Sequence, residues 1–566
     1  MSCDMKNGKE DKGFQRGAFL LLCSAVVVKL IGALFKIPLS SRYCLGDLGF
    51  GYFSSAYDLF TPFYALAMAG LPIAVSKTVS EYLSQSRFND VRQTIKVSRR
   101  LYLAAGLICF LCLGALIYPF SRLTGSTGAG IYSLLAMTPS VIFCCLMSSY
   151  RGYYQGLNNM LPTAVSELIE ALCKLILGFG FGFLTVKLTG NVAFGAAAAI
   201  FGITVGTAVS TLYLKLYYKF KGDGISKEQV SLSPIAGGGR SAAKALVLIA
   251  VPVALASLAG NITLIIDALT VRRQLGTLDE NSFNVIREMY AFSIADYNKT
   301  AWAPITNGEL AALLYGIRGK AYTIFNLVPT LTTVIGVSAV PVIAGLSAEK
   351  KHESLNSNIN SALKLTAFIS FPAGVGLFAV SAGIMGLLYD SAASVEIGAL
   401  LLKIFGIATV FAGVAIPLTG ILQAIGKQNA ALINIAVGAA VKLAVGLILV
   451  SVPEVNVRGA AFGTLACYAV IFVLHMITLL RSKGVSVNVK AVFLKPLVSA
   501  LACGLVARIV FCMGNSFFVT VLAILSAAIV YAFFLILLNF FDENDFNSLP
   551  KAEQIKGFCK KHRIIR

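Results

Sequence analysis

Residues 26–42 read VVVKLIGALFKIPLSSR. Most of this stretch is apolar enough to form the middle of a membrane-spanning helix, yet Lys29 and Lys36 lie inside it. Seven residues of helix bring the two ammonium groups to nearly the same face, about 20° apart around the axis and about 10 Å apart along it. A charge at the bilayer centre costs about 2.5–3.5 kcal/mol on insertion scales, and such residues usually face a cavity. We therefore expect both lysines to line a water-filled cleft.

The composition of the whole chain indicates a polytopic membrane protein. Of its 566 residues, 57% are hydrophobic and 13% are charged, and the mean hydropathy is +0.80. We expect an all-α fold of about fourteen transmembrane helices, because apolar stretches of about 20 residues recur along the chain. The predicted helices are 17–39, 50–75, 99–120, 131–150, 162–187, 191–217, 244–271, 311–345, 363–388, 398–424, 430–452, 456–480, 493–513 and 517–541.

The net charge of +21 follows the membrane topology. Lysine and arginine gather in alternate loops, at 76–100, at 215–244 and in the tail from 542, whereas the short loops 389–397 and 514–516 have none. This positive-inside pattern predicts a multi-pass membrane protein with both termini in the cytoplasm. A nucleic-acid partner is not expected, since its basic residues would cluster on a soluble face.

An internal repeat divides the chain. CKLILG at 173–178 and VKLAVG at 441–446 place Lys174 and Lys442 268 residues apart, and other weak matches keep the same order. Two lobes of six helices are therefore expected as parallel repeats, followed by two extra helices. The predicted organisation is an N-lobe at 1–219, a cytoplasmic linker at 220–243, a C-lobe at 244–482 with an outer-side insertion at 274–310, two further helices at 483–541 and a basic tail at 542–566.

More charged residues lie inside the apolar stretches. In the predicted helix 162–187, Glu167, Glu170 and Lys174 occupy positions i, i+3 and i+7 and so share one face. Glu170 and Lys174 can pair directly, either as a structural ion pair or as part of a ligand site. The other candidates are Asp267 in helix 244–271, Arg318 at the start of helix 311–345 and Lys442 in helix 430–452.

Other cations have simpler interpretations. Arg508 and Lys187 are expected to extend toward the membrane interface. Arg151, in RGYYQG, is expected to anchor the cytoplasmic end of helix 131–150. The twelve cysteines and three histidines show no spacing typical of a metal site. We expect no cofactor beyond a possible coupling ion, H⁺ or Na⁺.

Three motifs resemble those of a known family. They are KLIGALFKIPLSSRYCLGDLGFGYFSSAYDLF at 29–60, GLPIAVSKTVSEY at 70–82 and RGYYQGLNNMLPTAVSELIEALCKLILG at 151–178. They resemble the stage V sporulation protein B branch of the polysaccharide transporters, within the multidrug/oligosaccharidyl-lipid/polysaccharide flippase superfamily, and are similar to lipid II flippases. The resemblance runs through essentially the whole chain.

The resemblance implies two six-helix bundles around a central cavity and an alternating-access flippase that is not an enzyme. The implied substrate is a polyprenyl-pyrophosphate-linked sugar, with the peptidoglycan precursor lipid II as the first candidate. Lys29-Leu-Ile-Gly32 resembles an R-x-x-G pattern of lipid II flippases. Their second basic residue lies six positions further on, whereas Lys36 lies seven further on. Helices 493–513 and 517–541 resemble a pair that forms a lipid-tail groove.

These observations assign roles to the candidate residues. Lys29, Lys36 and Lys174 are expected to contact the pyrophosphate, and Lys442 and Arg318 to contribute to substrate binding. Asp267, Glu167 and Glu170 are expected to pair with the lysines in the empty site or to couple transport to an ion.

Alternative functions remain. An exporter of another lipid-linked polysaccharide unit would share the pyrophosphate chemistry. A multidrug cation antiporter would share the fold but would require acids rather than lysines in the cleft. A membrane enzyme is disfavoured, because the acids of 274–310 form no recognised catalytic spacing. No oligomeric state is assigned.

Overall fold

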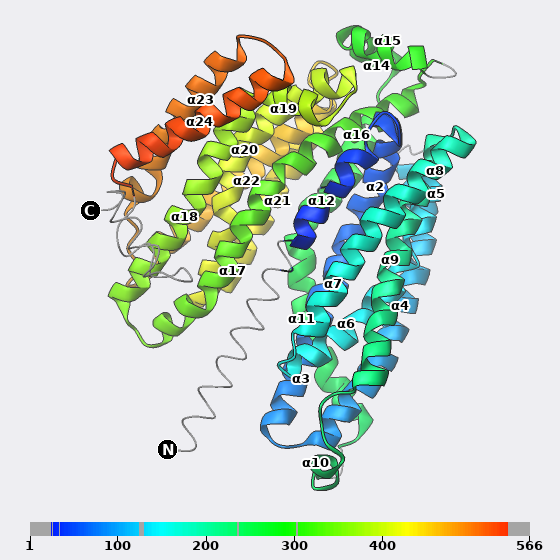
Figure 1. The fold of residues 1–566 in the computed structure, drawn as a ribbon, viewed down its shortest axis with the longest axis vertical. Coiled ribbons are helices and arrows are strands. Elements are labelled where there is room, and N and C mark those ends of the chain that lie inside the picture. The colour runs from blue at the N-terminus through cyan, green and yellow to red at the C-terminus, as the bar shows by residue number, and fades with distance from the viewer. Residues whose placement is uncertain are drawn as a thin grey trace. The chain divides into compact units, whose positions relative to one another are not determined.

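The computed structural model describes residue 24 and residues 27–32, 34–123, 129–234, 237–300 and 304–540. Every regular element in this part of the chain is helical (Figure 1). The chain forms two compact units. Unit 1 contains residues Met1–Thr277 and Asn307–Gly316, and unit 2 contains Leu278–Thr306 and Ile317–Arg566. The predicted all-α membrane fold is confirmed.

Unit 1 begins with helical residues 27–32 and 34–39. The elements that follow are α2 (Gly46–Ala65), η1 (Leu66–Gly70), α3 (Leu71–Ser84), α4 (Phe88–Leu123), α5 (Ala129–Met137), α6 (Ser140–Gly156), α7 (Leu161–Cys173), η2 (Lys174–Gly178), α8 (Phe179–Thr189), α9 (Val192–Lys221), α10 (Lys227–Ser231), α11 (Gly239–Gly260), α12 (Ile262–Ile266), η3 (Asp267–Val271) and α13 (Arg272–Gly276). The η elements are single π-helical turns.

Unit 2 is also helical, and it shares α16 with unit 1. Its elements are α14 (Glu280–Met289), α15 (Ala291–Thr300), α16 (Asn307–Phe325), α17 (Leu327–Ala348), α18 (His352–Ala379), α19 (Ser381–Leu388), α20 (Ala392–Ala424), α21 (Gln428–Val450), α22 (Arg458–Leu480), η4 (Lys490–Leu494), α23 (Lys495–Phe511) and α24 (Phe517–Leu537).

Twelve helical segments of the described part are long and apolar enough to span a membrane. They coincide with twelve of the fourteen predicted stretches. The other two, 17–39 and 244–271, include residues or side chains outside the described part. The chain is therefore a multi-pass membrane protein, while the cytoplasmic position of its termini stays a prediction.

Local sequence sets the helix ends. α8 ends at Gly190, whose φ of +67° suits a residue without a side chain. The Asn191 side chain then accepts hydrogen bonds from the amides of Ala193 and Phe194, which caps the start of α9. In this way the short sequence TGNV closes one span and opens the next.

One predicted helix is divided and longer at its start. Instead of a single helix at 311–345, α16 begins at Asn307 and ends at Phe325, and α17 follows. Pro329 lacks the amide N–H that would bond to the Phe325 carbonyl, which explains the break. The expectation that Arg318 lies at the start of its helix was therefore wrong, since it lies in the second half of α16.

The compact units do not follow the predicted lobe boundaries. Residues 244–277 were assigned to the C-lobe, but α11 packs on η1, α3 and α4 and belongs to unit 1. The predicted linker, 220–243, also lies within unit 1. The repeat relationship between the lobes stays a prediction.

The linker is fastened to the start of α4. Asp223 pairs with Arg92 at 3.0 Å and accepts a hydrogen bond from Tyr153 at 3.2 Å. Further along, the Gly237 amide donates to Asp90 Oδ1 at 2.7 Å. Near α10, Asn89 donates to the carbonyls of Val230, Ser233 and Pro234. The linker is thus held at both ends by side chains of unit 1.

Within unit 1, α2 and the first part of α16 cross closely through glycines. A Cβ atom on Gly51 would lie 1.9 Å from the Ala312 carbonyl oxygen, and one on Gly316 would lie 2.1 Å from that of Asp47. Beside this crossing, the Tyr315 hydroxyl donates to Asp58 Oδ2 at 2.8 Å. Only glycine permits this approach of the two backbones.

We predict that Gly51→Ala lowers the free energy of unfolding by about 1–3 kcal/mol, as expected for an overpacked contact. Heat or denaturant unfolding in detergent measures the change. Gly180→Ala is the matched control, because a Cβ atom there meets nothing within 4 Å. Equal stabilities of the Gly51 and Gly180 variants would contradict the close crossing.

Asp223 generates a second prediction. Burial alone would raise the pKa of Asp223, but hydrogen bonds from Arg92 and from the Ile225 amide outweigh it and hold the pKa below its ordinary value. The carboxylate therefore supports the linker above the ordinary pKa of about 3.9, and that support is lost as the pH falls through the lowered value.

Asp223→Asn should accordingly speed hydrogen exchange of the amides in 222–234 by about tenfold at neutral pH, since hydrogen bonds to charged groups contribute about 1.5–3 kcal/mol. Exchange mass spectrometry measures the rates. Glu228→Gln, at an exposed position of α10, should leave them unchanged. A linker that exchanges equally in both variants would show that the ion pair does not hold it.

Candidate functional site: a basic cluster in unit 1 and an apolar groove in unit 2

Glu170 of α7 is the centre of a buried charge cluster. Only 3% of this residue is exposed. Its carboxylate pairs with Lys174 Nζ at 2.7 Å and with Arg151 at 3.1 Å, and it accepts a hydrogen bond from the Tyr64 hydroxyl at 3.0 Å. One carboxylate therefore holds two cations.

Helical geometry brings these groups together. Lys174 follows Glu170 by four residues and begins the π-helical turn η2. Ser166 precedes Glu170 by four residues and accepts a hydrogen bond from Arg151 Nε at 2.8 Å. Arg151 reaches this face of α7 from α6 and is 3% exposed. One face of α7 thus presents both acceptors of the guanidinium.

Two tyrosines of α2 extend the cluster toward Lys36. Lys174 Nζ lies 5.2 Å from the ring centroid of Tyr64, and Lys36 Nζ lies 4.6 Å from that of Tyr57. The rings are seven residues apart and share a face of α2. Cation–π contacts of this kind favour the ammonium groups where water is scarce. We call Lys36, Arg151, Lys174, Glu170, Tyr57 and Tyr64 the basic cluster.

Glu167 of α7 contacts Ser24, the first described residue of the chain. Its Oε2 atom accepts a hydrogen bond from Ser24 Oγ at 3.1 Å. Lys29 lies in the helical residues 27–32 and is exposed. Three cations thus have contacts within the basic cluster: Arg151 and Lys174 pair with Glu170, and Lys36 lies against Tyr57. The place of Lys29 in the site stays a prediction.

The other predicted site residues lie elsewhere. Asp267 is 1% exposed and begins η3 in unit 1. Lys442, on α21, is 2% exposed, and Arg318, on α16, is fully buried; both belong to unit 2. The guanidinium carbon of Arg318 lies 4.9 Å from the ring centroid of Tyr322. Their roles in substrate binding stay predictions.

Sequence reasoning missed two parts of the cluster. Arg151 was expected to anchor a helix end, which was wrong, because it is buried and paired with Glu170. Its burial depends on α6 packing near α7, which no local pattern reveals. Tyr57 and Tyr64 were not singled out, although their seven-residue spacing matches that of Lys29 and Lys36 and could have indicated them.

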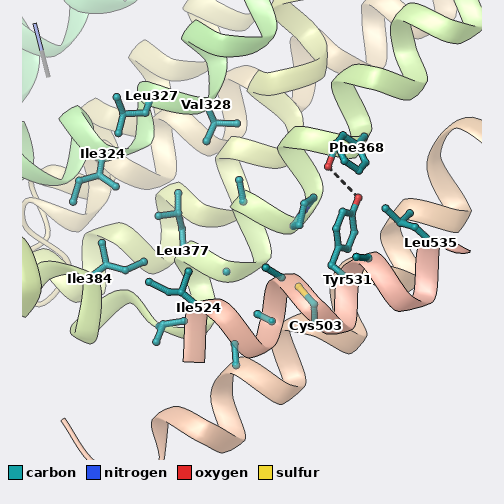
Figure 2. Close-up of a pocket in the computed structure, with 18 of the residues that line it drawn as sticks. Ile324, Leu327, Val328, Phe368, Leu377, Ile384, Cys503, Ile524, Tyr531 and Leu535 are labelled. Carbon is teal, nitrogen blue, oxygen red and sulfur yellow. Dashed lines mark hydrogen bonds between the residues drawn. The ribbon is translucent and has the colours of Figure 1, made fainter. Parts of the chain in front are cut away.

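Unit 2 contains a large apolar groove. Its volume is about 730 Å³, and its walls come from α16, α17, α18, α19, α23 and α24 (Figure 2). Representative lining residues are Ile324, Leu327, Leu377, Ala528 and Leu535. This lining suits a hydrocarbon chain, because it offers apolar contact and few polar groups.

The chain is similar to known protein families. A family model described as polysaccharide biosynthesis protein matches residues 14–346, more than half of the 566-residue chain. The chain belongs to this family. A second model, described as MatE, matches residues 316–448 of the chain. The first match includes the whole basic cluster.

Curated relatives match this chain over most of its length. It is 24% identical over 508 residues to the lipid II flippase MurJ of Bacillus subtilis, covering 88% of each chain. It is 25% identical over 481 residues to the stage V sporulation protein B of the same organism, covering 84% of this chain and 85% of the relative.

Solved structures share the fold. A lipid II flippase MurJ in an inward closed conformation matches with a TM-score of 0.66 at 15% identity, covering 92% of this chain and 98% of that chain. An inward-facing multidrug resistance transporter of the MATE family and MOP superfamily matches with a TM-score of 0.56 at 15% identity, covering 80% and 97%. The chain thus shares the fold of these two structures, and the activities named among these relatives are those of flippases and transporters.

We predict that Glu170→Gln lowers the free energy of unfolding by about 3–5 kcal/mol, because it leaves the buried Arg151 and the half-buried Lys174 without their shared counter-charge. Unfolding in detergent and the yield of folded protein in the membrane measure the effect. Glu167→Gln is the control, since Glu167 accepts one hydroxyl hydrogen bond from Ser24. A Glu170 variant as stable as the Glu167 variant would contradict the central role of this carboxylate.

Proposed function

We propose that this protein is an alternating-access flippase that moves a polyprenyl-pyrophosphate-linked sugar from the inner to the outer leaflet, with lipid II as the first substrate to test. The observation that carries the proposal is the basic cluster within a membrane-spanning unit, in which three cations, Lys36, Arg151 and Lys174, accompany one carboxylate, that of Glu170. A bilayer tolerates such an excess where a passenger or a water-filled cavity offsets it.

The charge balance favours an anionic passenger. A pyrophosphate carries negative charge that hydrocarbon does not solvate, so it must be accompanied by cations during transfer. Lysine ammonium groups act as point charges with rotatable donors and can follow a phosphate as it moves. Lys29 and Lys36 supply such groups, and Lys174 joins them when it exchanges Glu170 for the pyrophosphate.

Glu170 gives the empty site a stable resting state. It neutralises part of the cluster through Lys174 and Arg151, and it stays paired with Arg151 when Lys174 turns to the substrate. For coupling to H⁺ or Na⁺, Asp267 and Glu167 are the stronger candidates, because Glu170 already holds two cations.

The apolar groove of unit 2 supports the same substrate class. A polyprenyl-linked sugar has a long hydrocarbon tail as well as a charged head, and the groove formed with α23 and α24 offers an apolar surface for the tail. The relative named as a lipid II flippase covers 88% of this chain, which makes lipid II the first glycan to test.

A multidrug cation antiporter is the second candidate, because the MatE model matches residues 316–448. Cations in a low-dielectric site repel a cationic drug, so the basic cluster disfavours this function. Loss of drug resistance on deletion of the protein would favour it.

The test of the proposed function is lipid II exposure at the outer leaflet of cells whose own flippases are depleted. We predict that the protein restores exposure and that the double variant Lys29→Ala/Lys36→Ala reduces it at least tenfold at equal protein level. Lys187→Ala, an exposed cation near the end of α8, is the control for a general loss of positive charge.

The outcomes separate the hypotheses. Full exposure by the double lysine variant would refute the assignment of the pyrophosphate site to these residues. No restoration by well-expressed wild-type protein would exclude lipid II, and the same assay with another polyprenyl-linked glycan would then decide between a different flippase substrate and the antiporter.

A further inference from the structure

Helix α18 carries an interrupted hydrogen bond at the wall of the apolar groove. The carbonyl of Phe368 would normally accept from the amide four residues later, but that residue is Pro372, which has no N–H. Hydrocarbon provides no water to replace it, so a second protein group must donate. Tyr531 of α24 does so, with its hydroxyl 3.0 Å from the Phe368 oxygen (Figure 2).

This hydrogen bond joins two walls of the groove that otherwise touch little. α23 packs along α18, and α24 packs on α23 with sparse contact to α18. The groove occupies the space that this arrangement leaves open. The rings of Tyr531 and Phe368 also meet, with centroids 5.8 Å apart.

The chemistry of the lining sets Tyr531 apart. Among the described residues that line the groove, it contributes the one hydroxyl. Immediately around Tyr531, the α24 residues that line the groove are alanines, Ala527, Ala528 and Ala532, whereas the larger Ile524, Leu535 and Ile536 lie at the ends of the lining stretch. Small side chains leave the width of the groove to the separation of α24 and α18, and the Tyr531 hydroxyl fixes that separation at one point.

We propose that Tyr531 is a positioning residue of the groove: its hydroxyl, bonded to the carbonyl that Pro372 leaves open, holds α24 against α18 and sets the width available to the polyprenyl tail. The inference deepens the proposed function and rests on it, because it takes the groove as the tail site. Loss of the hydroxyl lets α24 move away, so the groove holds the tail less tightly.

The experiment measures tail binding directly. The probe is a polyprenyl pyrophosphate with a photoreactive group at the end of its tail, added to the full-length protein in phosphatidylglycerol–phosphatidylethanolamine vesicles. Mass spectrometry quantifies labelling of peptides covering 368–377 and 524–536. A diacyl phospholipid with the same photoreactive group reports ordinary bilayer lipid in the groove.

We expect Tyr531→Phe to reduce polyprenyl labelling by roughly threefold to tenfold, in line with measured interhelical hydrogen bonds in membranes. Tyr132→Phe makes the same chemical change at an exposed tyrosine of α5 in unit 1 and should have no effect. Unchanged labelling in the Tyr531 variant would overturn the inference.

Pro372→Ala separates the hydrogen bond from simple packing. Alanine restores an amide N–H that can bond to the Phe368 carbonyl within α18, so the Tyr531 hydroxyl is no longer required there. Tyr531→Phe should therefore reduce labelling less in the Pro372→Ala background than in the wild type. An equal reduction in both backgrounds would show that Tyr531 does not act through this carbonyl.

The two proposals fail in different ways. Equal labelling of wild-type protein by both probes would show that the groove is a general lipid surface and would overturn the inference. The lipid II exposure assay with the Lys29→Ala/Lys36→Ala variant would still test the flippase proposal. Selective polyprenyl labelling without lipid II exposure would support the inference and direct the search to another polyprenyl-linked substrate.

Discussion

The carboxylate of Glu170, shared between Arg151 and Lys174, is the interaction on which the basic cluster depends. Membrane-spanning helices have no water to solvate a buried charge, so each charge needs a partner within the protein. One acid that holds two cations leaves the surroundings positive while keeping each group hydrogen-bonded. Such a cluster is stable without a ligand.

The lack of water within the membrane also explains a contact at the apolar groove. A proline in α18 removes one amide from the helix, and the Tyr531 hydroxyl replaces it from α24. The backbone carbonyl without an intrahelical donor thus forms a hydrogen bond that joins α18 to α24, two helices that otherwise pack little on each other. The proposed function rests on these two features, the basic cluster of unit 1 and the apolar groove of unit 2.

The positions at which the chain crosses from one unit to the other differ from the predicted linker. The linker of 220–243 belongs to unit 1, fixed by Asp223, Asn89 and Gly237. The chain passes from one unit to the other at 277–278, at 306–307 and inside α16 at 316–317. The stretch 220–243 is therefore part of unit 1 and does not cross between the units.

The sequence alone determined the class of the protein, because hydropathy and length suffice to locate spans in a hydrocarbon solvent; twelve predicted stretches coincide with helices of the described part. Helical spacing also predicted the Glu170–Lys174 pair, since both residues lie on one helix. Only the tertiary structure revealed that Arg151 shares Glu170, that Tyr57 and Tyr64 lie beneath the lysines, and that α11 joins unit 1. These features depend on contacts between helices distant in sequence, and one-dimensional spacing carries no information about which faces meet.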